Sequence, residues 1–99
     1  MTGTTLSEYQ IMERLGDVNY ENIRDMYAKA VVLKSLSELD KKSSFLEIYG
    51  IASRKGVGYN PEGTSLRQLE KRGLVIAEED VGRKLFSLTD KGKKILDLE

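Results

Sequence analysis

Apolar residues recur at every third or fourth position through the first 40 residues, a spacing that predicts two helices. The first helix spans Ser7 to Leu15, with Ser7 as its N-cap and Gly16 as its terminator. The second, longer helix runs from Tyr20 to Leu39 and begins at a cap formed by Asp17 or Asn19. Each pattern is amphipathic, so each helix is expected to bury one face.

Two more helices are predicted between residues 44 and 73. The pattern over Ser44 to Lys55 gathers aromatic and aliphatic residues on one helix face. Two glycines within residues 56–59 then interrupt the pattern. A fourth helix is expected from Asn60 to Arg72, because Asn is a preferred N-cap and Pro61 suits the first helical position, while Gly73 ends the helix.

The period then changes to short apolar runs, which are typical of strands. Residues 74–77 and 85–88 are predicted strands, and the charged connection of residues 78–84 contains a turn glycine, as in a β-hairpin. Thr89 is expected to cap a last helix, Asp90 to about Leu98. The predicted fold class is therefore mainly α with a small β-hairpin.

Composition narrows the chemistry that the chain can support. With 99 residues the chain suits one small domain, and it contains no Cys and no His. Thiolate and imidazole groups are thus excluded as nucleophiles, bases or metal ligands. No EF-hand spacing, P-loop or dinucleotide motif is present, so we expect no metal, no cofactor and no enzymatic activity.

The apolar runs are also far shorter than the roughly 20 residues that a membrane-spanning helix needs. The first five residues lack the basic start and apolar core of a signal peptide. We therefore expect a cytoplasmic protein without a membrane partner.

The segment 64–75 (TSLRQLEKRGLV), the charged hairpin and the segment 88–96 (LTDKGKKIL) occur in the order found in one group of regulators. This set resembles the winged helix-turn-helix regulators of MarR and PadR type, in which "LxxLEKRGLV", a charged wing and "LTxKGxxxL" follow one another. The resemblance covers residues 28–98. It implies a winged helix-turn-helix domain over residues 28–99, a recognition helix at about 60–72 and a wing at about 75–88.

The predicted recognition helix carries a polar outer face that suits this role. On a helical wheel Thr64, Arg67, Gln68 and Lys71 face away from the core side, which Leu66 marks. Arg and Gln can pair with guanine and adenine edges, and Lys and Thr suit guanine or phosphate. An ordinary solvated helix face is the alternative interpretation of the same residues.

The connecting segments supply further candidate contacts. Arg54 and Lys55 end the preceding helix, where cations either stabilise the helix terminus or hold phosphate. The resemblance assigns contact with the minor groove or the backbone of DNA to Arg83 and Lys84 in the wing, although pairing with Glu78 or Glu79 across the hairpin is an alternative. The residues predicted to contact DNA are Arg54, Lys55, Tyr59, Asn60, Thr64, Ser65, Arg67, Gln68, Lys71, Arg83 and Lys84.

Residues 1–27 form an N-terminal helical extension that a minimal winged helix does not need. By resemblance, the extension is expected to form a homodimer contact that places two recognition helices about 34 Å apart on a palindromic DNA site. The alternative is that its first helix covers the core of its own subunit. The apolar residues of the extension, which exceed what one small core needs, favour the dimer.

The leading interpretation is a dimeric, sequence-specific regulator that binds double-stranded DNA. The alternative is a winged-helix protein-interaction module in a replication, transcription or membrane-remodelling complex. A balance of 16 basic and 16 acidic residues favours the alternative. By segment, however, residues 53–72 carry five bases against two acids, whereas residues 1–33 carry five acids against three bases. The sequence identifies neither an operator nor a small-molecule effector.

Overall fold

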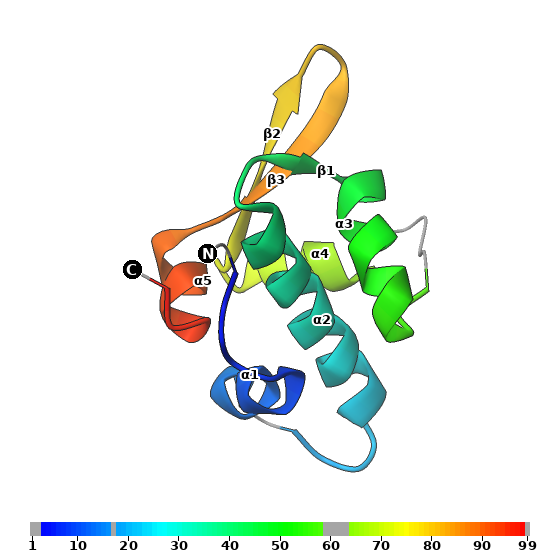
Figure 1. Ribbon diagram of the computed structural model, residues 1–99, viewed down its shortest axis with the longest axis vertical. Helices are drawn as coiled ribbons and strands as arrows, with labels where there is room; N and C mark the ends of the chain where they lie inside the picture. The colour runs from blue at the N-terminus through cyan, green and yellow to red at the C-terminus, as the bar shows by residue number, and fades with distance from the viewer. Residues whose placement is uncertain (1–2, 17, 59–63, 99) are drawn as a thin grey trace.

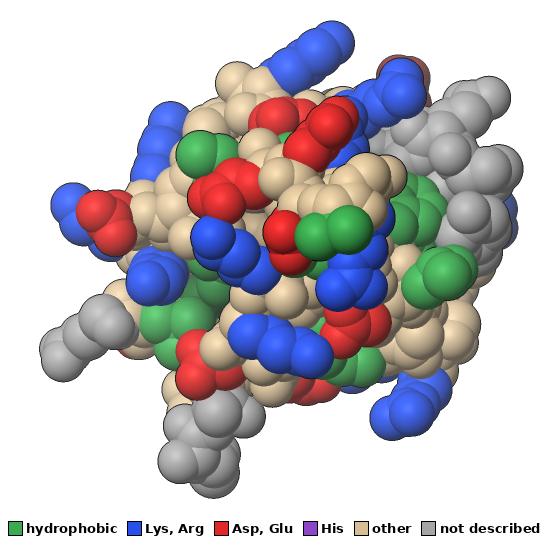
Figure 2. Space-filling view, turned by 90° about the horizontal axis from the view of Figure 1, so that it is seen from above, with side chains coloured by type: hydrophobic (Ala, Val, Ile, Leu, Met, Phe, Trp, Pro, Cys, Tyr) green, Lys and Arg blue, Asp and Glu red, His purple; other side chains and the backbone are tan. Residues whose placement is uncertain are grey.

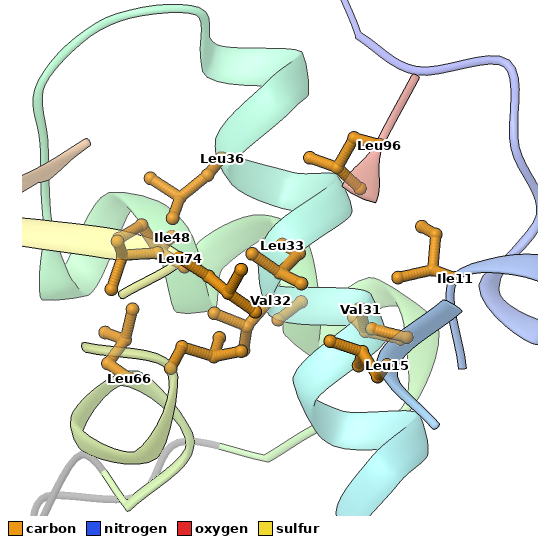
Figure 3. Close-up of a cluster of buried hydrophobic side chains, with 14 of the residues drawn as sticks. Ile11, Leu15, Val31, Val32, Leu33, Leu36, Ile48, Leu66, Leu74 and Leu96 are labelled. Carbon is orange, nitrogen blue, oxygen red and sulfur yellow. The ribbon is translucent and has the colours of Figure 1, made fainter. Parts of the chain in front are cut away.

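The central element of the structure, a computed structural model, is α2 (Ile23–Leu39). Its middle turns are buried on nearly all sides, and Val31, Val32 and Leu33 are completely inaccessible to solvent. Side chains from every other helix and from the sheet surround α2 in a single hydrophobic cluster (Figure 3). Because these three side chains are apolar and point to different sides of α2, neighbouring elements must cover the helix on those sides for the chain to fold.

The structure describes residues 3–16, 18–58 and 64–98. In this part of the chain there are five α-helices, one 3-10 turn and a three-stranded antiparallel sheet (Figure 1). In addition to α2, the elements are α1 (Glu8–Leu15), β1 (Ser43–Ser44), α3 (Phe45–Ala52), η1 (Ser53–Lys55), α4 (Thr64–Lys71), β2 (Val75–Asp80), β3 (Arg83–Leu88) and α5 (Asp90–Ile95).

The sheet is small and has the order β1-β3-β2. β2 and β3 form a hairpin in which Val75 lies opposite Leu88 and Asp80 lies opposite Arg83. The hairpin extends well away from the helices (Figure 1). β1 was not predicted from the sequence, because its two serine residues carry no strand signal; Ser43 is nevertheless buried opposite Phe86.

The predicted helix starts are confirmed where a side chain caps the helix. Ser7 and Ser44 each form a reciprocal capping box, with Gln10 and with Glu47. Thr89 accepts a hydrogen bond from the Gly92 N–H at the start of α5. These caps satisfy backbone N–H groups that a helix end otherwise leaves unpaired.

Several predicted bounds were wrong. The long helix begins at Ile23 instead of Tyr20, because Asn19 and Asn22 hydrogen-bond each other's backbone in a turn. Tyr20 is consequently 95% exposed. The third helix tightens into η1 over its last turn, and α5 ends at Ile95, near Asp97 in a left-handed conformation. The first residues of the predicted fourth helix, 60–63, lie outside the described residues.

The hairpin strands are also longer than predicted. The charged segment 78–84 was expected to connect them, but five of its seven residues belong to the strands and only Val81 and Gly82 form the loop. Both loop residues have positive φ angles, 50° and 79°. Such a two-residue loop matches the right-handed twist of the strands.

The N-terminal segment belongs to the same core as the rest of the chain. Ile11, Met12 and Leu15 of α1 are buried against α2, and Met26 is buried near the start of α2. The boundary expected between residues 27 and 28 therefore falls inside a continuous helix. Because these apolar residues cover their own subunit, they no longer support the inference of a dimer that was drawn from their number.

Basic side chains join three helix ends in a closed ring. Arg72, just after α4, donates to the Leu15 carbonyl at the end of α1 at 2.6 Å. Arg14 of α1 donates to the Lys94 and Ile95 carbonyls of α5, at 3.4 Å each. Lys91 of α5 donates to the Arg72 carbonyl at 3.2 Å. Each cation thus satisfies carbonyls at the negative end of a neighbouring helix.

Among the described residues, no helix is long and apolar enough to cross a membrane.

Gly92 sits where α5 meets the backbone that follows α4. A Cβ atom at this position would lie 2.1 Å from the Leu74 carbonyl oxygen, which is far inside van der Waals contact. Gly50, by contrast, lies within α3 with open space around its Cα atom. The two glycines therefore differ in whether tertiary packing requires them.

We predict that Gly92→Ala lowers the free energy of unfolding by about 3 kcal/mol, because α5 must move away from the Leu74 backbone to admit the methyl group. The control Gly50→Ala is expected to raise it by up to about 1 kcal/mol, since alanine is the better helix former. Urea denaturation followed by circular dichroism measures both changes. Equal effects of the two substitutions would contradict the close packing of Gly92 against Leu74.

Candidate nucleic-acid interface

α4 separates its apolar and polar residues cleanly. Leu66 and Leu69 are buried in the core, as their spacing predicts. Arg67 and Lys71 are exposed on the outer side, and Gln68 is half-buried beside them. Glu70 is also exposed. The outward face therefore presents two cations and an amide, next to one carboxylate.

The remaining candidates around α4 occupy different surroundings. Ser65 is half-buried and hydrogen-bonds the Tyr49 side chain of α3, so its hydroxyl is directed toward the protein. Burial raises the pKa of Tyr49, and this hydrogen bond partly offsets the rise. Thr64 is the first residue of α4. Tyr59 and Asn60 lie outside the described residues.

Arg54 and Lys55, though adjacent in η1, differ sharply. Arg54 is exposed. The Lys55 ammonium lies 3.2 Å from a Glu38 carboxylate oxygen and 3.8 Å from a Glu8 oxygen. Its carbonyl accepts a hydrogen bond from the Tyr27 hydroxyl at 3.3 Å. Two carboxylates therefore take up the charge that the sequence assigned to phosphate, and we leave Lys55 out of the proposed interface.

The ion pairs of Lys55 belong to a larger cluster. Lys34 of α2 also binds the Glu8 carboxylate, at 2.8 Å, and both of these side chains are about four-fifths buried, with exposed fractions of 19% and 22%. The hydrogen bond from Lys34 is the main reason that the pKa of Glu8 is lowered, although burial opposes the shift. The cluster ties α1, α2 and η1 together.

The Glu47 side chain stabilises the start of α3 as part of its capping box. The backbone N–H of Ser44 donates to the Glu47 carboxylate, and Lys41 lies 2.9 Å from it. Together these groups lower the pKa of Glu47 to about 2, with the backbone hydrogen bond as the largest cause. The Glu47 carboxylate of the capping box therefore stays ionised throughout the physiological pH range.

The hairpin charges are arranged in opposed pairs. Arg83 lies directly opposite Asp80, and Lys84 directly opposite Glu79. Glu78 is engaged elsewhere: the Lys42 ammonium hydrogen-bonds its carboxylate at 2.7 Å, which raises the pKa of Lys42. Viewed from the hairpin end, acidic and basic side chains alternate over the surface without forming a continuous positive patch (Figure 2).

A cleft of about 650 Å³ opens beside α4. The α1, α2 and α3 walls of this cleft supply three tyrosines, and α4 contributes Ser65 and Gln68. The described residues that line it are Tyr9, Met12, Ile23, Arg24, Asp25, Tyr27, Ala28, Lys29, Tyr49, Gly56, Val57, Gly58, Ser65 and Gln68. Its rim, like the hairpin, mixes both signs of charge.

Contacts between charges far apart in the chain were not predicted from the sequence. Lys55 and Glu8 are 47 positions apart in the chain, and no periodicity links them. Lys42 was not predicted to pair with Glu78, because β1 and its approach to the hairpin were not anticipated. The described residues contain no group of three acidic side chains that could hold a metal ion.

Comparison of the chain with models of protein families finds no matching family, and comparisons with curated proteins and with solved structures likewise find no match.

We predict that Glu8→Gln lowers the free energy of unfolding by about 1 kcal/mol at pH 7, because Lys34 and Lys55 lose their charged partner. The folded-state pKa of Glu8 is below its ordinary value of 4.5, so its ionic contribution is complete above that pH. The contribution is lost as the pH falls through the folded-state pKa.

Denaturant titrations at pH 7 and pH 3 test this dependence. The difference between wild type and Glu8→Gln should shrink at the lower pH. Glu13→Gln is the control, because Glu13 is exposed on the same helix. A difference that stays constant with pH would show that the Glu8 charge is not what stabilises the cluster.

Proposed function

We propose that the chain is a winged helix-turn-helix domain that binds double-stranded DNA in a sequence-specific way as a transcriptional regulator. The observation that carries the proposal is the outward face of α4, where Arg67 and Lys71 are exposed over a helix anchored by two buried leucines. A helix that reads bases in the major groove needs such an anchored polar face.

The order of the elements supports the same proposal. A helix, a short strand, two helices and a two-stranded hairpin follow one another as α2, β1, α3, α4 and β2–β3. In this arrangement α4 is the recognition helix and the hairpin is the wing. The resemblance of segments 64–75 and 88–96 to MarR and PadR regulators agrees with the order. The activity is binding, without a chemical step.

The proposed roles follow from exposure and charge. Arg67, Gln68 and Lys71 read or flank the bases, and Arg54 holds a phosphate. Thr64 is included with the base-reading residues on its sequence position alone. Arg83 and Lys84 are exposed and can approach phosphate, but the carboxylates opposite them reduce their attraction for it. Lys55 and Arg72 are structural, since both are bonded to groups of the protein itself.

The proposal includes a homodimer. The large apolar side chains left exposed near α1 and the start of α2 are Tyr9, Val18, Tyr20 and Ile23, with exposed fractions between 38% and 95%. Contact through these residues would join two copies and present two α4 helices to one duplex. Sedimentation equilibrium of the free protein tests this part independently of DNA.

The alternative is a protein-interaction module with the same fold. Paired charges on the hairpin and a net charge of zero favour this alternative, because they weaken long-range attraction to DNA. The salt dependence of duplex binding separates the two functions. A DNA-binding protein neutralises phosphates and releases counterions, so its affinity for a duplex falls steeply as the salt concentration rises. A protein-interaction module would show no such salt-dependent binding to a duplex.

We predict that Arg67→Ala weakens binding to a selected duplex by about 1–3 kcal/mol, if the duplex is one that the wild-type protein enriches from a randomised pool. Binding to random duplex should change much less, because a base contact carries sequence information. Fluorescence anisotropy at several salt concentrations measures both affinities.

The matched control compares two exposed lysines. Lys71→Ala, in α4, should weaken binding, whereas Lys93→Ala, on the exposed side of α5, should leave it unchanged. Absence of salt-dependent duplex binding by the wild-type protein, or equal effects of the two lysine substitutions, would overturn the proposed function.

A further inference from the structure

The turn that joins α1 to α2 holds an aromatic side chain away from the protein. Tyr20 lies in this turn and is 95% exposed. The Asn19 side chain accepts hydrogen bonds from the N–H groups of Glu21 and Asn22, at 2.9 and 3.1 Å. The Asn22 side chain accepts one from the Asn19 N–H at 2.8 Å. Because the backbone is already fixed, little conformational entropy is left to lose when the tyrosine ring binds a partner.

The cleft beside α4 offers aromatic surface to a further ring. Tyr9 and Tyr27 line it with their ring centroids 6.3 Å apart and their planes tilted by 48°. The Tyr27 hydroxyl donates to the Lys55 carbonyl, so the polar end of this ring is satisfied within the fold. Aromatic rings attract one another at centroid distances of about 4.5–7 Å. The cleft volume of about 650 Å³ leaves ample room for one more ring at such a distance.

The exposed tyrosine and the cleft belong to one end of the molecule, remote from the hairpin (Figure 1). Ile23 and Arg24, which line the cleft, follow Tyr20 by only three and four residues. Tyr20 itself is too exposed to occupy the cleft of its own subunit. A protruding ring and a receptor for it on one surface are what an isologous dimer requires, because a two-fold axis brings each ring to the other copy's receptor.

The charges around the ring and the cleft are complementary. Glu21, which follows Tyr20, is exposed and makes the turn acidic. The cleft carries two cations, Arg24 and Lys29, against one carboxylate, Asp25. When the turn of one copy approaches the cleft of the other, an acidic group therefore meets a surface with an excess of positive charge. A second copy makes this match twice.

We propose that a second copy of the chain closes this cleft, with Tyr20 of each copy inserted into the cleft of the other. The inference rests on the homodimer of the proposed function and deepens it by naming the anchor and its receptor. Two inserted tyrosines bury roughly 300–500 Å². Stable interfaces bury at least about 1,200 Å² in total, so the surrounding Tyr9, Val18 and Ile23 must supply the remainder. We therefore expect a dissociation constant in the micromolar range.

Substitutions on either side of the contact test the insertion by sedimentation equilibrium. Tyr20→Ala removes both anchors of a dimer and should raise the dissociation constant by at least about thirtyfold, whereas Tyr20→Phe keeps the ring and should retain most of the association. Gly58→Trp should weaken association to a similar degree by filling the cleft, since a side chain at the exposed Gly58 meets open space.

The matched control is Leu46→Ala in α3. Leu46 is also a large exposed apolar residue, with an exposed fraction of 71%, but it does not line the cleft. Its substitution should leave the dissociation constant unchanged. At concentrations too low for dimers, all variants should melt within a few degrees of wild type, because the substituted residues are exposed.

A mixture of the two deficient variants tests whether the insertion is reciprocal. Tyr20→Ala keeps an open cleft but has no anchor, and Gly58→Trp keeps its anchor but has a filled cleft. Their heterodimer retains one of the two insertions. It should therefore form about fivefold more tightly than either variant associates with itself, as measured by sedimentation velocity with a fluorescent label on one variant.

Wild-type association by Tyr20→Ala, or no gain in the mixture, would contradict the insertion. A wild-type protein that stays monomeric at millimolar concentration would contradict it as well. Duplex binding measured on the same samples separates this failure from that of the proposed function. Salt-dependent binding by a monomer would leave DNA recognition standing without the dimer, whereas a dimer with reciprocal insertion that binds no duplex would leave only the present inference standing.

Discussion

The burial of α2 is the constraint on which the rest of the structure depends. Ala30, Val31, Val32 and Leu33 are inaccessible to solvent over one full turn, so no side of this turn faces water. α1, α3, α4 and the sheet must each cover part of it, and each does so with its own apolar face. The orientation of α4 follows from this requirement: when Leu66 and Leu69 pack inward, Arg67 and Lys71 point outward.

The fold also determines which charged side chains remain available at the surface. Many cations of the chain are bonded to neighbouring groups: Arg72 and Arg14 to helix carbonyls, Lys55 to carboxylates and Lys42 to Glu78. A balance of charge over the whole sequence therefore says little about any one surface. What matters for the proposed interface is that Arg67 and Lys71 are exposed on one helix face.

The sequence predicted those features of the fold that depend on residues close to one another in the chain. The caps formed by Ser7 and Thr89, the approximate start of α3 and the leucine spacing of α4 were predicted correctly, because they involve residues within one or two helical turns. Packing of α1 into the core, the β1 strand and the ion pairs of Lys55 join residues far apart in the chain. No sequence pattern of a single chain encodes these partners. The sequence accordingly indicated the exposed face of α4, but it did not show that Lys55 is ion-paired within the fold.

The central claim is that the outward face of α4 meets DNA. Titration of the isotopically labelled protein with a selected duplex, followed by amide chemical shifts in NMR spectra, tests this claim most directly. The account predicts that the largest shifts fall on residues 64–71, while the buried middle of α2 changes little. Shifts confined to the exposed apolar residues near α1, or no shifts at all with DNA, would contradict it.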